Sequence, residues 1–315
     1  MTTRIIIDCD TGTDDALAIL YALSRPDLDV LGITTVFGNT DIAQTTRNTL
    51  QVLELVGRAG VPVARGAEHP LVGRFTQGAA WIHGRNGLAD IELPIPVRRP
   101  EEASAPEFLR RQLRGAPGEI TLVATGRLTN IATLLRQDPE CARLVRRCVL
   151  MGGAVTAPGN VTPVAEANIC GDPEAAAIVF GSGMPMTMVG LDVTMRALLS
   201  QSQIDRLARA GGRVLDVASE IAAFRLRSYR RRDPRIGGCA IHDVLAVDVV
   251  ADPTVVRTQR WPVEIETKGD VTRGMTVADR RPHTTAPPNA DVCVEVEADR
   301  FLERFEERMG TYRGT

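Results

Sequence analysis

The chain has 315 residues, 44% of them hydrophobic and 24% charged, so it is long enough to bury a large core. Its formal net charge of −2 gives no reason to expect a nucleic acid or an anionic membrane as a partner. The six cysteines show no C-x-x-C spacing, no apolar run approaches the roughly 20 residues of a membrane helix, and the N-terminus lacks a signal-peptide pattern. We therefore expect a soluble cytoplasmic protein with free thiols.

The first third of the chain alternates short apolar segments with amphipathic ones. This pattern predicts strands at residues 4–8, 28–38 and 61–66, and helices at residues 14–23 and 40–57, with Gly57 as the C-cap of the second helix. A loop rich in glycine and proline is predicted from about residue 67 to residue 100.

The same alternation continues along the rest of the chain. Strands are predicted at residues 119–125, 146–153 and 184–192, and helices at residues 128–137, 172–180 and over most of 200–251. Residues 260–281 are predicted to form a hairpin, and residues 292–310 a strand that leads into a terminal helix. Repeated strand–helix units imply a largely parallel central sheet flanked by helices. We predict an α/β protein with one domain spanning residues 1–315 and a small C-terminal hairpin.

Polar residues follow the predicted strands at the points where the strands end. Residues 10–15 follow the first strand, residues 38–39 end the second, and His83 lies in the loop after the third. Thr125 and residues 151–153 end the next two strands. Ligands of parallel sheets bind outside the carboxyl ends of the strands, so we expect the active site there.

The segment DCDTGTDDALAIL (residues 8–20) places four aspartates in one short turn between a strand and a helix. Asp14 and Asp15 have a structural explanation, because one can cap the helix and the other favours its positive end. Asp8 and Asp10 at the strand end need neutralisation, protonation or a metal ion. Carboxylates with loop carbonyls suit Ca²⁺ or Mg²⁺ better than Zn²⁺, and we favour a metal site over capping alone.

A strand that ends in D-x-D also opens the phosphatases of the haloacid dehalogenase type, which use an aspartyl-phosphate nucleophile and Mg²⁺. Those enzymes usually carry Thr or Val where this chain has Gly12, and they need a positively charged residue near the phosphate. The sole lysine, Lys268, lies in the predicted hairpin. Both differences weaken this interpretation, and a Mg²⁺-dependent phosphatase is kept as the alternative function.

The aspartate segment resembles the D-x-D-x-x-x-D-D signature of the nucleoside hydrolases, which cleave ribonucleosides to base and ribose. The resemblance spans nearly the whole chain, through VFGNT (36–40), HGRNGLAD (83–90), ATGRLTNIA (124–132), MGGAVTAPGNVTPVAEANI (151–169) and AIHDVLAV (240–247). It implies a Rossmann-like nucleoside hydrolase fold and hydrolysis of purine or pyrimidine ribonucleosides.

The resemblance also implies a Ca²⁺ site formed by the carboxylates of Asp10, Asp15 and Asp243 and the backbone carbonyl of Thr125. Asp10 would be the general base that activates a metal-bound water, and the transition state would resemble an oxocarbenium ion. His242, directly before Asp243, is a candidate acid for protonating the leaving base.

Further side chains are assigned to the substrate by the same resemblance: Asp14, Asn39, His83, Met151, Asn160, Glu166, Asn168 and Tyr229. Asp14 and Asn39 would bind the 2′-hydroxyl of ribose, and Asn168 the 3′-hydroxyl together with Asp243. Asn160 and Glu166 would surround the 5′-hydroxyl with Asn168, whereas His83 and Tyr229 would shape the space for the base. Asp8 either orients the loop or caps the strand end.

The base and the exact substrate stay open at this point. Ala167 and Cys170 stand where the family commonly has larger residues, which enlarges the pocket near the 5′ end of the sugar. The arginine-rich segment RLRSYRRRDPR (225–235) is interpreted as a solvated helix end rather than a phosphate site. Another N-ribosyl compound such as nicotinamide riboside is an alternative substrate, and a non-catalytic nucleoside binder an alternative function. The family relation implies a homodimer or homotetramer.

Overall fold

The central sheet is built from short strands whose side chains are buried on both faces. The structure, a computed structural model, describes residues 2–314. The last five residues of β1 (Thr3–Cys9) are buried, as are all residues of β4 (Ile120–Ala124) and β6 (Met186–Val189). Such continuous burial is typical of parallel strands that are covered by helices on both sides.

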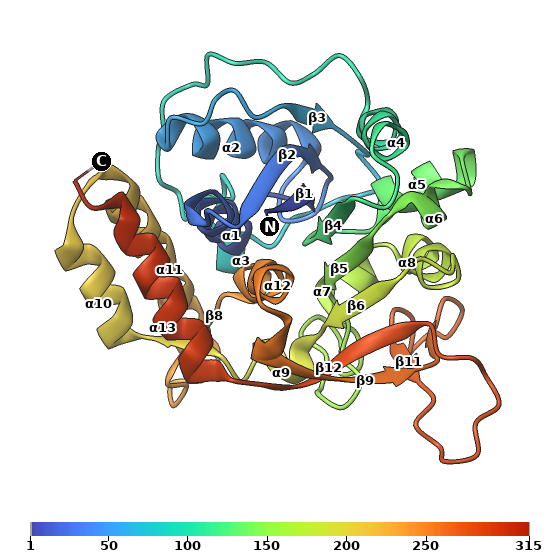
Figure 1. Cartoon of the computed structure of the whole chain (residues 1–315). Coiled ribbons are helices and arrows are strands. Elements are labelled where there is room, and N and C mark those ends of the chain that lie inside the picture. Colours follow the sequence, from blue (N-terminus) through green and yellow to red (C-terminus); the bar gives the residue numbers. More distant parts are fainter. Residues whose placement is uncertain (1, 315) are drawn as a thin grey trace.

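Eight strands form one sheet in the order β3-β2-β1-β4-β5-β6-β12-β9 (Figure 1). The remaining members are β2 (Leu28–Thr35), β3 (Val63–Arg65), β5 (Arg147–Met151), β9 (Val256–Trp261) and β12 (Ala290–Val296). All neighbouring strands are parallel except β9 and β12. The predicted α/β fold with a mostly parallel sheet is therefore confirmed.

Helices cover both faces of the sheet, which creates a hydrophobic core on each side. Side chains of β1 alternate between these two cores. Ile5 and Ile7 belong to one core and Ile6 to the other. The first core includes side chains of α1 (Thr13–Ser24), α2 (Ile42–Leu55), α10 (Gln201–Ala210), α11 (Arg213–Arg232), α12 (His242–Ala251) and α13 (Ala298–Met309). The second includes side chains of α4 (Ala105–Gly115), α5 (Thr129–Gln137), α6 (Cys141–Leu144) and α8 (Pro173–Phe180).

Three short helices lie in the loops that follow strands. They are α3 (Ala80–His83) after β3, α7 (Ala167–Gly171) after β5 and α9 (Leu191–Thr194) after β6. The ends of the longer helices follow the local sequence. The side chain of Asp41 accepts a hydrogen bond from the first turn of α2. Gly57, with φ +67°, lies one residue beyond the C-cap of α2, in a conformation that favours glycine.

The C-terminal hairpin is smaller than predicted. Its strands are β10 (Val263–Ile265) and β11 (Thr276–Ala278), whereas Arg260 and Trp261 belong to β9 and pair with β12 in the main sheet. A second small antiparallel pair joins β7 (Leu198–Ser200) to β8 (Gly238–Ala240), and β8 lies within residues 200–251, which were predicted as mostly helical. Helix α4 and the four-residue helix α3 were not predicted, and α3 interrupts the expected loop at residues 67–100.

The remaining single-turn elements are the 3₁₀ helices η1 (Pro253–Val255) and η2 (Gly310–Tyr312). All six cysteines are free thiols, as predicted, and five of them are buried. Within residues 2–314, every helix is too short or too polar to cross a membrane.

Candidate active site

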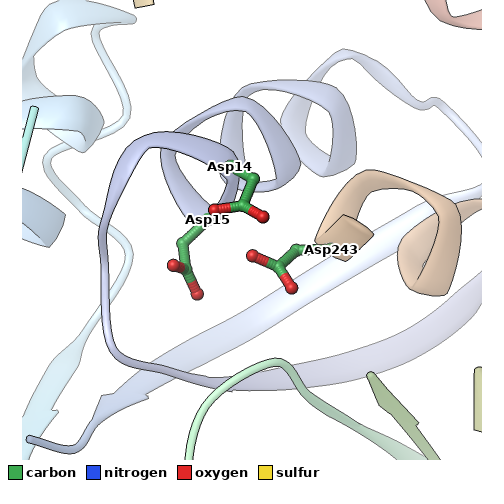
Figure 2. A group of neighbouring side chains, drawn as sticks. All are labelled: Asp14, Asp15 and Asp243. Atoms are coloured by element: carbon green, nitrogen blue, oxygen red, sulfur yellow. The ribbon is translucent and has the colours of Figure 1, made fainter. Parts of the chain in front are cut away.

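Three buried carboxylates meet where helices α1 and α12 begin. Asp14 and Asp15 lie in the first turn of α1, and Asp243 lies in the first turn of α12. One carboxylate oxygen from each lies within 4.8 Å of the other two, and Figure 2 shows the three side chains turned toward one another. We call these three residues the carboxylate cluster. Their arrangement suits a cation, because oxygens so close together repel one another otherwise.

The electrostatics of the carboxylate cluster reflect this crowding. Burial and the neighbouring carboxylates raise the pKa values of Asp15 and Asp243 well above their ordinary values. Burial opposes ionisation of Asp14 too, but the positive charge of the Arg225 guanidinium holds its pKa below the ordinary value. The protein therefore supplies positive charge to Asp14 and leaves Asp15 and Asp243 without a cationic side chain of comparable effect.

The helices that carry the carboxylate cluster are joined by a second polar network at the other end of α1. The Tyr21 hydroxyl donates a 2.6 Å hydrogen bond to Asp248 of α12. Arg25 donates to the Tyr21 oxygen at 3.0 Å, and Arg304 of α13 donates to the other Asp248 oxygen at 2.6 Å. Asp248 is fully buried, so these contacts compensate its charge and fix α12 against α1.

Asp10 lies beside the carboxylate cluster and has partners of its own. Its two oxygens accept hydrogen bonds from the Asn39 backbone at 2.9 Å and from the Asn39 side chain at 3.1 Å. The Arg127 guanidinium forms an ion pair with it. Burial raises the Asp10 pKa to about 6, although Arg127 acts against this shift. Asn39 also donates to Asp15 at 2.9 Å, which links Asp10 to the cluster.

Thr125, at the end of β4, contacts the same group of residues through two atoms. Its hydroxyl donates to Asp15 at 2.9 Å, and its backbone carbonyl accepts a 2.7 Å hydrogen bond from the Asn168 side chain. The same Asn168 amide donates to the Met151 carbonyl at 3.1 Å. Asn168 thus joins the ends of β4 and β5, which are neighbours in the sheet.

Glu166 and Asn160 hold the loop between β5 and α7. The Glu166 carboxylate accepts from three backbone amides, those of Gly153, Asn168 and Ile169, at 2.8–3.1 Å. Asn160 is exposed, and its side chain accepts from the Ala167 amide at 3.0 Å. Both residues stabilise loop structure here, and Glu166 is buried at the start of α7.

Two of the four histidines lie at this site, as the sequence motifs predict. His83 accepts a 3.1 Å hydrogen bond from the Thr13 amide, and burial lowers its pKa to about 3. His242 pairs with the Tyr229 hydroxyl and with the Thr194 hydroxyl, each at 2.8 Å. Burial lowers the pKa of His242 to about 4. Both imidazoles are therefore neutral at pH 7 in this environment.

Arg225 corrects one prediction, because it is not part of a solvated helix end. It is 1% exposed, and its guanidinium donates to Asp14 at 2.8 Å and to the Thr13 hydroxyl at 2.7 Å. It also donates twice to the Ala240 carbonyl. The signal was present, since Arg225 precedes Tyr229 by four residues and so lies on the same helix face.

Asp8 lies at the edge of the site. Its carboxylate accepts hydrogen bonds from Thr34 and Asn130, and burial raises its pKa to about 7. Among residues 2–314, its second carboxylate oxygen has no hydrogen-bond partner.

Trp81 of α3 is stacked against Arg232 of α11, whose guanidinium carbon lies 3.2 Å from the ring centroid. Arg127 and Thr194, which contact Asp10 and His242, were not predicted from the sequence.

A family model for inosine-uridine preferring nucleoside hydrolases matches residues 5–303. The chain belongs to this nucleoside hydrolase family. Family membership makes it an N-glycosyl hydrolase that acts on ribonucleosides, which confirms the enzyme class inferred from the sequence motifs.

Relatives of this nucleoside hydrolase differ in the base that their names specify. Pyrimidine-specific ribonucleoside hydrolase RihA of Citrobacter koseri is 41% identical over 313 residues, which are 99% of each chain. Uridine nucleosidase 1 of Arabidopsis thaliana is 40% identical over 277 residues, covering 88% of this chain and 82% of that protein. The structure of a purine-preferring ribonucleoside hydrolase from Gardnerella vaginalis matches with a TM-score of 0.94 and 37% identity over 99% of both chains.

Proposed function

We propose that this nucleoside hydrolase cleaves pyrimidine ribonucleosides in a Ca²⁺-dependent reaction. The observation that carries the proposal is the carboxylate cluster, in which oxygens of Asp14, Asp15 and Asp243 lie within 4.8 Å of one another in a buried position. A pyrimidine base is favoured because the relatives named above at 40% and 41% identity are named for pyrimidine nucleosides or uridine.

The residues present fit a calcium ion. Carboxylate and carbonyl oxygens are the ligands that Ca²⁺ prefers, and a buried group of like charges needs a cation. Asp10, Asp15, Asp243 and the Thr125 carbonyl would hold the ion, with Asp14 in contact with the same group. When bound, Ca²⁺ supplies the positive charge that these carboxylates lack and coordinates oxygens of the sugar and of water.

The ribose would be bound by side chains that surround the cluster. Asp14 and Asn39 would bind the 2′-hydroxyl, and Asn168 with Asp243 the 3′-hydroxyl. Asn160 and Glu166 lie in the loop before α7, the helix that contains Asn168. We assign both residues to the 5′ end of the sugar, and Met151 to the side of the pocket there. These contacts would fix the anomeric carbon in place before bond cleavage.

Asp10 is proposed as the general base. Its carboxylate is held in place by the Asn39 hydrogen bonds, and next to a bound divalent cation it would be ionised and able to accept a proton from the attacking water. The positive charge that develops on the sugar ring would be stabilised by the surrounding carboxylates.

Protonation of the leaving base is assigned to the paired side chains of Tyr229 and His242. Because His242 is neutral at pH 7, it would act through the hydrogen bonds that it forms with Tyr229 and Thr194 rather than as a preformed cation. Tyr229 and His83 would also shape the space for the base.

The proposal is tested by measuring ribose release from uridine, cytidine, inosine, adenosine, guanosine and nicotinamide riboside, with Ca²⁺ and after chelation. We expect release that is fastest with uridine or cytidine and that is lost on chelation. Faster release from a purine nucleoside or from nicotinamide riboside would contradict the pyrimidine assignment. Undiminished activity after chelation would contradict the metal. The phosphatase alternative is not favoured, and release of inorganic phosphate from nucleotides tests it directly.

Three further assignments stay proposals. We propose that residues 1–315 form one domain, that the protein acts in the cytoplasm, and that it forms a homodimer or homotetramer. The mass of the purified protein in solution, measured by light scattering, would contradict the last assignment if it equalled that of one 34.0 kDa chain.

A further inference from the structure

Arg127 occupies a fitted space next to Asp10. It lies in the turn between β4 and α5, and its side chain is 12% exposed. Gly38 and Gly171 make room for it, because a Cβ atom on either glycine would collide with the Arg127 side chain. Its guanidinium carbon lies 6.0 Å from the centroid of the Phe37 ring. The surrounding chain therefore accommodates a cation at this position.

The ion pair of Arg127 is held by fewer contacts than that of the other arginine at the site. Every guanidinium nitrogen of Arg225 donates a hydrogen bond, to Asp14, Thr13 or Ala240. In Arg127 the guanidinium contacts Asp10, and its buried Nε has no hydrogen-bond partner in the part of the chain that the structure describes. Arg225 is thus fixed by several acceptors, whereas Arg127 depends on Asp10 and can be displaced from it.

The atom that Arg127 contacts is one that a metal ion would also need. Oδ2 of Asp10 accepts from both Arg127 and the Asn39 backbone amide, while Oδ1 accepts from the Asn39 side chain. A carboxylate oxygen with two donors has no further lone pair to offer. Asp10 is also the one proposed carboxylate ligand that lies outside the carboxylate cluster.

We propose that Arg127 is an internal counter-ion that competes with the divalent metal for Asp10. The ion pair excludes coordination of the metal through Oδ2 of Asp10, and the Arg127 charge repels an ion bound through Oδ1, so Arg127 sets the metal affinity of this enzyme. The inference rests on the proposed metal site but not on the proposed base. The competition has an electrostatic cause as well as a geometric one, because the positive charge of Arg127 beside Asp10 repels a divalent cation bound at the same carboxylate.

Two consequences follow for the isolated protein. Without metal, Arg127 offsets the repulsion between Asp10 and the carboxylates of Asp14 and Asp15. With metal, that compensation is no longer needed. Loss of Arg127 is therefore expected to weaken the metal-free protein and to strengthen metal binding at the same time.

The test is calorimetric titration of chelator-treated protein with CaCl₂. We compare the wild type with Arg127→Met, and use Arg136→Met as the matched control, because Arg136 is exposed at the end of α5. Arg127→Met should bind Ca²⁺ at least about tenfold more tightly than the wild type. Arg136→Met should stay within about twofold of the wild type, as expected for an exposed charge. The rise in melting temperature on adding Ca²⁺ should also be larger in Arg127→Met.

Each outcome of the titration decides a separate point. Equal or weaker Ca²⁺ binding by Arg127→Met would overturn the competition and assign Arg127 a supporting role. If neither the wild type nor the variant bound Ca²⁺, the proposed metal site would fail as well, which separates the two proposals. Should Arg127→Met not fold without metal, Arg127→Lys serves instead. It keeps the charge without the planar fork, so its affinity should lie between those of the wild type and Arg127→Met.

Discussion

Asp10 has a raised pKa, and hydrogen bonds from Asn39 fix its carboxylate. Its role as the base can be tested by a variant that changes its charge and keeps its size. Asp10→Asn keeps the size of the side chain but removes the base. We expect kcat to fall by at least about 100-fold with an unchanged circular dichroism spectrum, and a lower melting temperature, because the amide leaves at least one donor of Asn39 or Arg127 without its acceptor. Asp29→Asn, at an exposed position of β2, is the matched control and should keep full activity. Wild-type kcat in Asp10→Asn would remove Asp10 from the reaction.

Arg225 is the only cationic side chain hydrogen-bonded to Asp14 within residues 2–314. Arg225→Met leaves a buried carboxylate without its partner, so the free energy of unfolding should fall by about 3 kcal/mol, measured with urea in the presence of chelator. Arg227→Met removes an exposed arginine from the same helix and should change it by less than about 0.5 kcal/mol. Equal effects in the two variants would mean that the Arg225–Asp14 pair does not stabilise the fold.

The assigned role of His242 predicts a dependence on the leaving group. His242→Ala should slow uridine hydrolysis by at least about tenfold more than hydrolysis of a nitrophenyl riboside, since the activated leaving group needs no proton. The measurement is kcat/KM for both substrates. Equal losses on the two substrates would show that His242 holds the site in shape without helping the base to leave.

Single residues differ in how far the sequence alone could predict them. Asp15, Asp243 and His242 sit in motifs next to strand ends, so their meeting follows from the parallel sheet. The burial of Arg225 depends on how α11 packs against α1, and the sequence signals it only through the spacing of four residues between Arg225 and Tyr229. Arg127 is one residue in a turn without periodicity, and its contact with Asp10 exists only in three dimensions.

The short helix α9 positions groups on two sides of the site. Asp192, in its first turn, accepts hydrogen bonds from the amides of Val155, Thr156 and Ala157 in the loop after β5. Thr194, at its other end, contacts His242. Helix α9 therefore connects the loop that leads to Asn160 with the histidine assigned to the base.

Asp192→Asn tests this connection. An amide has one accepting oxygen, so at least one of the loop amides loses its partner and the loop becomes less ordered. We expect KM for uridine to rise by about tenfold while kcat changes by less than about threefold, because ground-state binding is weakened more than the chemical step. Asp216→Asn, at an exposed position of α11, is the control. An unchanged KM would mean that the Asp192 contacts do not position the sugar.

Among the elements, long periodic segments were predicted well and short ones were not. Helices α1, α2 and α5 and the strands before them have clear apolar patterns. Helix α3 has four residues, too few for a periodic signal, and its place depends on contacts with α11. The predicted hairpin begins three residues too early, because Trp261 and Val263 fit the pattern of one strand, although Trp261 pairs with β12 and Val263 with β11.

At the scale of the whole molecule, metal binding to the folded state alone must raise its stability. At a Ca²⁺ concentration 100 times the Kd, the gain is about 2.7 kcal/mol. For a protein of this size we expect the melting temperature to rise by about 4 °C or more relative to chelated protein, in a single calorimetric transition. Asp243→Asn should lose most of this rise. Two separate transitions in the wild type would contradict one domain over residues 1–315.

The position of β12 in the sheet has a consequence for synthesis of the protein on the ribosome. This strand inserts between β6 and β9, although both precede it in the sequence, and β9 has no other strand partner in residues 2–314. A nascent chain that has been made through β9 already contains every site residue up to Asp243. The edge of β6 is still exposed in that chain, and β9 has no strand to pair with. Until residues 290–296 emerge, such an open edge invites pairing with other chains. Chaperone demand during translation should therefore persist after the active-site residues have been made, and truncation before β12 should yield aggregates rather than a smaller enzyme.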